Sequence, residues 1–453
     1  MLFTVTGVPR QVLISLSLYI GQMIIGFTLS WTGAIFPKLQ DPNESPLQVL
    51  PSGSQLSFIA SLIYVGGIPG PPIMGWLSNI KGRKPCLMIA GVIMSLAYLL
   101  LMFSHNLAML YCGRIMSGFG MGIIGVINVV YMGEIASTNI RGMLLTALGV
   151  FLTIGAILMY SVGYFLSYVA ATSVGLALSI ALTLSILLIP ESPIFYILKG
   201  KDELVEDVLR ELGREKDLDD LKASKESFQN TTSKKDWIEL FKIKSNRKAL
   251  IIVILINIFQ HCSGIITIIT FSSIIFDMAG SSIDSYISMI TISCFQLIGS
   301  GLVTIFIERY GRKTLLLISC AITSFSMLIL GVYFFYEYMN YSGINDVKWL
   351  PLVILIVFCI GYDVGLGIIP NTLTGEMFTT NVRSKGSAVV MSTTWVTGFA
   401  VTTMFGAILN VAGGHVAFWF FSCSSACAFL FTLFFIPETK GKTLLAIQEL
   451  IEK

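Results

Sequence analysis

The chain has 453 residues, of which 55% are hydrophobic and only 12% are charged, whereas soluble globular domains average about 25% charged residues. A soluble protein of this length could not cover its surface with so few charges, so the composition indicates a membrane protein. It excludes a soluble enzyme and a secreted disulfide scaffold. The formal net charge of +3 is too small to indicate a nucleic-acid partner.

Twelve apolar segments are long enough to cross a bilayer as helices, which takes about 20 residues each. Only helices and closed barrels satisfy the backbone in lipid, and long apolar runs without alternation predict helices. In chain order the predicted spans are 11–31, 55–78, 86–104, 108–132, 143–166, 169–189, 249–276, 285–306, 314–336, 350–375, 386–409 and 415–436.

The basic residues predict the orientation of these spans, because cytoplasmic loops of membrane proteins carry an excess of Lys and Arg. With both termini in the cytoplasm, only Lys38, Arg114 and Lys348 of the 29 basic residues fall on the opposite side. We therefore expect a multi-pass protein with both termini cytoplasmic.

One long polar segment, 191–248, separates the sixth and seventh spans and carries 13 basic and 13 acidic residues. Within it, apolar residues recur at helical spacing, which predicts short amphipathic helices in a cytoplasmic linker. The balanced charge favours this interpretation over a polybasic lipid-binding patch. The apolar residues are Leu204, Val208, Leu209 and Leu212.

Three motifs occur twice, in the same order, where even-numbered spans end. Such a duplication is typical of two helical bundles that rock about a site near the membrane midplane. The sequence thus predicts an all-α membrane protein with twelve transmembrane helices in two six-helix bundles, at 1–190 and, with a cytoplasmic tail, at 249–453. The repeated motifs are Gly82-Arg83-Lys84 with Gly311-Arg312-Lys313, Glu134…Arg141 with Glu376…Arg383, and Pro190-Glu191 with Pro437-Glu438.

These motifs place glutamates near arginines at the cytoplasmic helix ends, where ion pairs can hold one conformation and separate in another. The alternative is that the basic residues only set the topology, but their recurrence in both halves favours a conformational role. The expected gating residues are Arg83, Glu134, Arg141, Glu191, Glu308, Arg312, Glu376, Arg383 and Glu438.

The motifs together resemble the sugar porter family of the major facilitator superfamily, and within it the insect trehalose transporter-like proteins. The most specific is Pro437-Glu438-Thr439-Lys440-Gly441-Lys442-Thr443-Leu444, and the resemblance extends from Gly26 to Leu444. It implies the major facilitator fold and facilitative transport of trehalose or a hexose such as glucose across the plasma membrane, by alternating access and without a cofactor.

The resemblance also implies that the C-terminal half binds most of the sugar. Gln260 matches the first sugar-binding Gln of the family, and His261 stands where a second Gln is usual. The alternative role of each of these side chains is a hydrogen bond to a neighbouring helix. The candidate substrate-binding residues are Gln260, His261, Asn371, Thr394 and Trp395.

Several positions depart from the family pattern and keep a second hypothesis open. They favour a transporter-like sugar sensor, or a non-transporting homologue with an eroded sugar site. An enzyme is not expected, because the sequence has no metal-ligand cluster, nucleophile motif or phosphate-binding loop. The sequence gives no indication of the oligomeric state. The departures are Asn79, His261, Ile266 and Asn371.

The first span bears on the energetics of transport. Proton-coupled members of the family carry an Asp after a Gly-aromatic pair, near the Arg of span four. Here the stretch is Gly26-Phe27-Thr28, so Arg114 lacks a titratable partner there and Asp363 is the only acid well inside a span. Coupling needs a group whose charge changes between states, so the sequence predicts a uniporter.

Overall fold

The computed structural model describes residues 6–218, 234–281, 283–379 and 382–440, and this part of the chain is helical without a strand. Among the described residues, eleven helices or consecutive helix pairs are long and apolar enough to cross a membrane, and each coincides with a predicted span. The remaining predicted span, 285–306, lies on α15 (Ser285–Arg309), where the side chains of 302–309 are outside the described set.

The helices of the first half are α1 (Val8–Gln40), α2 (Gly53–Gly67), α3 (Gly70–Lys81), α4 (Arg83–Met102), α5 (Leu107–Ile135), α6 (Thr138–Phe165) and α7 (Tyr168–Leu187). Between the halves lie α8 (Pro193–Leu198), α9 (Asp202–Leu212), the 3-10 helix η1 (Glu215–Asp217) and α12 (Lys234–Lys242). The second half contains α13 (Lys244–His261), α14 (Ile265–Met278), α15 (Ser285–Arg309), α16 (Arg312–Tyr338), η3 (Ser342–Val347), α17 (Leu350–Val364), α18 (Ile369–Glu376), α19 (Arg383–Val411) and α20 (Gly414–Phe435).

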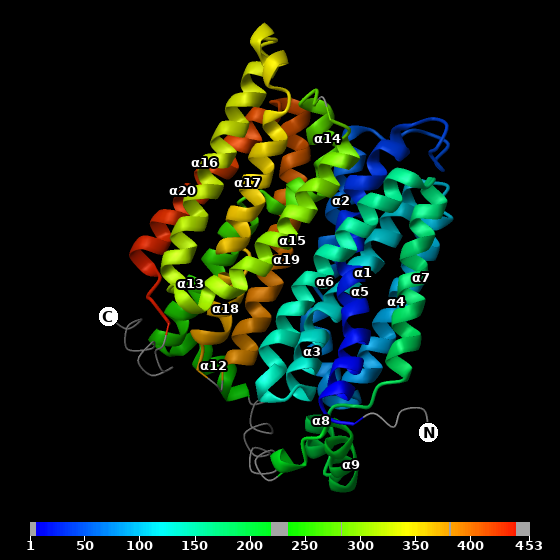
Figure 1. Ribbon diagram of the computed structural model, residues 1–453, viewed down its shortest axis with the longest axis vertical. Coiled ribbons are helices and arrows are strands. Elements are labelled where there is room, and N and C mark those ends of the chain that lie inside the picture. Colours follow the sequence, from blue (N-terminus) through cyan, green and yellow to red (C-terminus); the bar gives the residue numbers. More distant parts are fainter. Residues whose placement is uncertain (1–5, 219–233, 282, 380–381, 441–453) are drawn as a thin grey trace.

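The two halves form two bundles that stand side by side, blue to green and green to red in Figure 1. The first described helix begins and the last one ends at the lower end of the bundles, where α8 and α9 also lie. We call this end the linker side and the opposite end the far side. The bundles pack on one another through α1 with α14, α2 with α19 and α6 with α15.

The structure divides three of the predicted spans into two helices each, which the predicted ranges do not show. The span 55–78 breaks at the Pro69 between α2 and α3. The span 249–276 breaks before Gly264, whose φ of 98° lies in the left-handed region that favours glycine. The span 350–375 breaks between Gly365 and Ile368. Proline and glycine therefore set the breaks.

The linker helix α9 is amphipathic, but its buried face is not quite the predicted one. Val205, Val208, Leu209 and Leu212 are buried, whereas Leu204 is exposed. Leu204 and Val205 both fit helical spacing with the later residues, so the packing decides between them. On the linker side, Gln11 donates to the Leu212 carbonyl at 2.7 Å and fixes α9 under the first half.

Pairs of glycines allow helices of the first half to touch at their backbones. A Cβ atom on Gly66 would lie 1.9 Å from the Ile115 carbonyl oxygen, and one on Gly118 would lie 1.9 Å from the Ile63 carbonyl oxygen. Small residues at helix contacts are the usual device for close packing in membranes, where apolar side chains gain little from leaving lipid. The α2–α5 contact therefore has no room for a methyl group.

We predict that Gly118→Ala destabilises the protein by about 1–3 kcal/mol, because the added methyl group must push two backbones apart. Gly125→Ala on the same helix is the matched control, since a Cβ there meets nothing within 4 Å. The measurement is the temperature at which each purified variant loses its monodisperse peak in size-exclusion chromatography. Equal temperatures for the two variants would contradict this account of the contact.

Candidate functional site

Two broken helices of the second half meet at the candidate sugar site. Gln260, near the end of α13, is buried, and its side-chain nitrogen donates to the Gly367 carbonyl at 3.3 Å. Gly367 lies in the break between α17 and α18. Non-helical backbone within a membrane is tolerated only where protein covers it or where it lines a cavity. An amide that reaches such backbone can also exchange partners with a hydroxyl-rich ligand.

His261 and Thr394, the neighbours of Gln260 and Trp395, bond within their own helices. The Nδ1 atom of His261 lies 3.0 Å from the Asn257 carbonyl oxygen, one turn earlier on α13. The hydroxyl of Thr394 donates to the Val390 carbonyl at 3.0 Å. Both contacts are bonds to the carbonyl group four residues earlier on the same helix.

Trp395 lies where the two halves touch. Its ring packs against Tyr64 of α2, with 6.0 Å between ring centroids. It also fills the space beside Gly67, where a Cβ atom would lie 2.2 Å from the indole. Asn371, by contrast, is exposed on α18. Of the candidate binding residues, Gln260 bridges two helix breaks and Trp395 bridges the two halves.

Arg114 is buried in the first half among carbonyl groups and aromatic rings. Its guanidinium donates to the carbonyls of Thr28 at 3.1 Å and Ile59 at 3.3 Å, and it lies 5.4 Å from the Trp31 ring centroid. A cation over an indole face is stabilised by the ring quadrupole. The Thr28 hydroxyl lies 2.7 Å from the Tyr98 hydroxyl. No ion pair to Arg114 occurs among the described side chains.

Asp363 lies in the other bundle, buried on α17. One of its carboxyl oxygens, Oδ2, has no hydrogen-bond partner among the described residues. The same oxygen lies 3.7 Å from the position that a Cβ atom on Gly299 of α15 would take. A side chain at Gly299 would therefore contact this carboxyl group. Asp363 thus packs against α15 of its own bundle, apart from Arg114.

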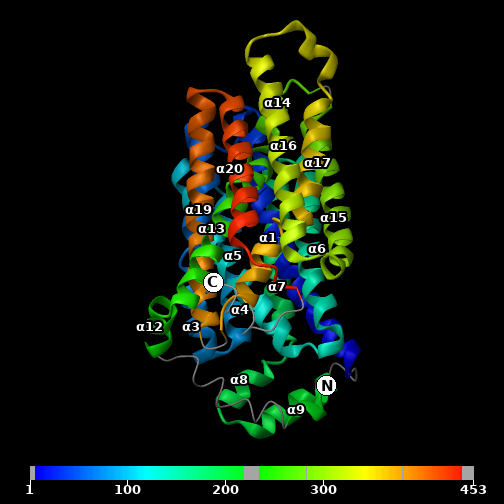
Figure 2. The same cartoon turned by 90° about the vertical axis from the view of Figure 1, so that its left-hand side faces the viewer.

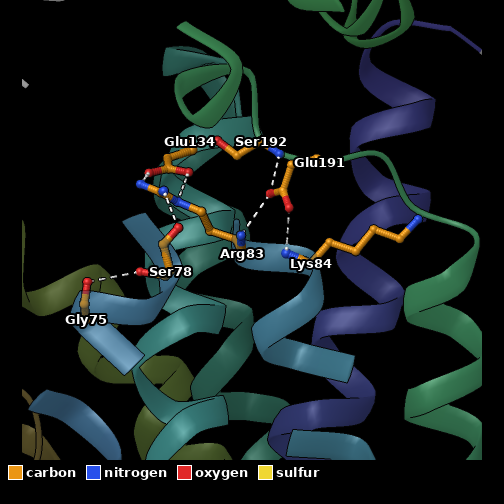
Figure 3. A network of polar contacts seen from close by, with 7 residues as sticks. All are labelled: Gly75, Ser78, Arg83, Lys84, Glu134, Glu191 and Ser192. Atoms are coloured by element: carbon orange, nitrogen blue, oxygen red, sulfur yellow. Dashed lines mark hydrogen bonds and ion pairs between the residues drawn. The ribbon is translucent and has the colours of Figure 1, made fainter. Parts of the chain in front are cut away.

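On the linker side, Arg83 and Glu134 form a buried ion pair that Figure 3 shows. Arg83 Nε and Nη2 donate to the two Glu134 carboxylate oxygens at 3.0 and 2.8 Å. Arg83 Nη1 donates to the Ser78 carbonyl at 3.0 Å. The pair ties the end of α3 and the start of α4 to the end of α5. Two parallel bonds make it both directional and strong.

Glu191, which lies between α7 and α8, caps the start of α4. Its carboxylate accepts hydrogen bonds from the backbone N–H groups of Arg83 at 2.9 Å, Lys84 at 3.1 Å and Ser192 at 2.8 Å (Figure 3). The free N–H groups and the dipole of a helix start favour a negative charge there. Burial raises the pKa of the Glu191 carboxyl, although these donors and the Arg83 guanidinium act in the opposite direction.

The glycine of the Gly-Arg-Lys motif makes room for this carboxylate. Gly82 has a φ of 105°, and a Cβ atom there would lie 2.2 Å from a Glu191 oxygen. In the second half, a Cβ atom on Gly311 would lie 2.0 Å from a Glu438 oxygen. The repeated spacing of the motifs thus reflects a repeated contact between a glycine, a helix start and a glutamate.

The second half repeats the rest of the network in looser form. Glu438 accepts hydrogen bonds from the backbone N–H groups of Arg312 at 2.9 Å and Lys313 at 3.2 Å. Arg312 pairs with Glu376 at 3.4 Å, and the Thr439 hydroxyl donates to Glu376 at 2.6 Å. The side chain of Glu308, also an expected gating residue, is outside the described residues.

Arg141 and Arg383 do not pair with these glutamates in the structure. Arg141 donates to the Ala136 carbonyl at 3.1 and 3.3 Å, and Arg383 has a buried Nε without a hydrogen-bond partner among the described residues. The observed pairs join each glutamate to the arginine of a Gly-Arg-Lys motif. Each network therefore lies within its own half, and the described residues show no ion pair of Arg141 or Arg383 with Glu134 or Glu376.

A contact that the sequence does not reveal joins the linker to this network. Arg214, just after α9, donates to the Glu134 backbone carbonyl at 2.7 Å. At the start of α1, Arg10 pairs with Glu211 of α9 at 2.5 Å. Arg214 and Glu134 are 80 residues apart in the chain, and Arg10 and Glu211 are 201 residues apart. No local pattern could have paired them.

Two bundles whose membrane-spanning segments include broken helices, with a duplicated network at one end, are the architecture of a transporter of the major facilitator type. The fold is similar to the inward-open xylose transporter XylE from E. coli, with a TM-score of 0.80 and 21% sequence identity over 96% of this chain and 99% of that one. XylE bound to 6-bromo-6-deoxy-D-glucose gives a TM-score of 0.77, with 22% identity over 98% and 99% of the two chains.

Residues 12–451 match the family model described as "Sugar (and other) transporter". The chain belongs to this family, as its motifs predict. Among curated relatives, the facilitated trehalose transporter Tret1 of Culex quinquefasciatus is 32% identical over 96% of this chain and 84% of that protein. Tret1 of Aedes aegypti is 32% identical over 96% of this chain, which spans only 54% of that protein's length.

We predict that Arg83→Ala lowers the free energy of unfolding by about 3–5 kcal/mol, because it leaves the Glu134 carboxylate buried without its partner. The side chains of this pair are only 6% and 10% exposed, against 22% and 28% for Arg312 and Glu376. Arg312→Ala should therefore lower the free energy of unfolding by less than Arg83→Ala does. Thermal unfolding of both purified variants checks the order, and an equal loss would contradict it. The double variant Arg83→Ala/Glu134→Ala should recover part of the loss.

Proposed function

We propose that the chain is a facilitative sugar carrier, which lets trehalose or a hexose such as glucose cross the plasma membrane down its own gradient. The observation that carries this proposal is Gln260, whose amide joins the breaks of two membrane helices. The relatives named facilitated trehalose transporter support the substrate class. The family expectation that the C-terminal half binds the sugar fits the same position.

Alternating access follows from the way in which the two halves are built. Each half is held together by its own linker-side network, around Glu134 and Glu191 in one and Glu376 and Glu438 in the other. In the described part of the chain, helices of different halves meet mainly through α1 with α14, α6 with α15, and α2 and α3 with α19. Rigid bundles with a limited contact can rock about a central site. Arg141 and Arg383, which have no carboxylate partner among the described residues, are then available for contacts in the opposite state.

The surroundings of Arg114 favour uniport over proton coupling. Its partners are carbonyl groups and an aromatic ring, which keep the same charge at all physiological pH values. A proton gradient can drive a conformational change only through a group that binds protons differently in the two states. Asp363 packs inside the other bundle, away from Arg114. The proposed carrier therefore equilibrates sugar and does not concentrate it.

A sensor or a non-transporting homologue is the competing function. It is favoured by the bonding of His261 to its own helix and by Asn371 in place of an aromatic residue. We expect saturable sugar uptake into vesicles that contain the purified protein, unchanged between external pH 5.5 and 7.5 and unaffected by a protonophore. Sugar preloaded on the inside should accelerate entry. Saturable binding without flux would favour the sensor, and accumulation that the protonophore collapses would refute uniport.

In the same vesicles, Gln260→Ala should weaken apparent sugar affinity by about tenfold, because each lost hydrogen bond to a ligand costs on the order of 1 kcal/mol or more. Gln260→Glu keeps the size and an acceptor but loses the donor, so its affinity should fall as well. Thr397→Val, which alters a hydroxyl bonded to its own helix and lies outside the candidate site, serves as the control for local packing. Unchanged affinity in Gln260→Ala would remove this residue from the site.

The proposed orientation places the linker side in the cytoplasm, because that side carries most of the basic residues. An epitope tag inserted after Asn43, in the far-side connection between α1 and α2, should be labelled by antibody on intact cells. A tag inserted after Gly200, between α8 and α9, should be labelled only after permeabilisation. The reverse pattern would invert the proposed topology.

A further inference from the structure

The linker helix α12 carries apolar side chains that the bundle does not cover. Trp237, Ile238 and Phe241 are 43%, 61% and 50% exposed, whereas Leu240 is completely buried. The exposed residues are separated by one, three and four positions, so they share one face of the helix. Leu240 anchors the opposite face, through contacts of α12 with α13 and α19.

The position of α12 distinguishes it from the other linker helices. Figure 2 shows α12 at the side of the bundle, level with the lower ends of α3 and α19, whereas α8 and α9 lie farther below. At this level a helix beside the bundle meets the boundary between lipid headgroups and acyl chains. An exposed Trp-Ile-Phe face would be unfavourable in water and is suited to that boundary.

The net charge also differs between the part of the linker with α8 and α9 and the part with α12, although the linker as a whole is neutral. The stretch 191–218, which includes α8 and α9, has five basic and eight acidic residues. The stretch 237–248 has four basic residues and one acidic residue. Three of these basic residues, Lys242, Lys244 and Arg247, are exposed. Summing the charge over the whole linker conceals this basic cluster.

We propose that α12 and the start of α13 form a docking surface for anionic phospholipids of the cytoplasmic leaflet. The Trp237, Ile238 and Phe241 side chains enter the acyl-chain boundary, and the ammonium and guanidinium groups of Lys242, Lys244 and Arg247 bind the lipid phosphates. Positive charge beside an apolar helix face selects an anionic bilayer surface over a neutral one. Because α12 leads directly into α13, the surface is connected to the proposed sugar site by one helix. Arg247 precedes Gln260 by 13 residues, which is between three and four turns of α13.

The test uses the full chain, one copy in each nanodisc, with either pure phosphatidylcholine or a mixture that contains phosphatidylserine. Hydrogen exchange is measured on peptides that cover 237–243, with α9 as the internal reference. We expect exchange in 237–243 to be about tenfold slower in the anionic discs, and high salt to reduce the difference, because salt screens exposed charges. Equal exchange in both kinds of disc would overturn the proposal.

The triple variant Lys242→Gln/Lys244→Gln/Arg247→Gln should abolish the difference between the discs. The matched control is Lys201→Gln/Arg210→Gln/Lys216→Gln, which removes three exposed basic residues under the first half. In this control the difference in exchange between the two kinds of disc should persist. Thermal unfolding verifies that both variants are folded. Protection that depends on protein concentration in detergent would assign the surface to a second copy of the chain and would also overturn the lipid proposal.

Discussion

The absence of water in the bilayer is the constraint on which the structure depends, because every backbone polar group there needs a partner in the protein. Unbroken helices meet this requirement by themselves. Where α13 and α17 end inside the membrane, the Gln260 amide supplies a donor to the Gly367 carbonyl. At the membrane edge, Glu191 and Glu438 accept the N–H groups that open α4 and α16. The side chains that matter most are those that complete an interrupted helix.

The buried charge of Arg114 follows from the same constraint. A guanidinium group needs acceptors, and two carbonyl oxygens of neighbouring helices provide them, with the Trp31 ring alongside. This arrangement holds the cation without an acid among the described side chains, and its partners there are carbonyl groups and an aromatic ring. The proposed uniport rests on this arrangement and on the Thr28 hydroxyl at the position where the family resemblance implies an acid in proton-coupled members.

Hydropathy and the internal repeat were sufficient to predict the fold, because apolar runs of about 20 residues have few alternatives. The same information could not predict which side chains face one another. The sequence pattern predicts Arg83 and Arg141 at the same membrane face as Glu134, and only the packing of α4 on α5 selects Arg83. Likewise, Leu204 and Val205 are adjacent on α9, and only Val205 is buried, because it packs with Ile197 of α8 and with Leu209 in a small cluster within the linker. Long-range contacts such as Arg214 with Glu134 leave no local pattern.

The confinement of each glutamate–arginine network to a single half has a consequence for inherited variation. A contact that is equally strong in both end states of a two-state switch cannot shift the balance between them. Substitutions at Arg83 or Glu191 would then alter how many molecules survive quality control in the cell, with little effect on the turnover of each survivor. Substitutions at Tyr64 or Trp395, where the halves touch, would change turnover while abundance stays normal.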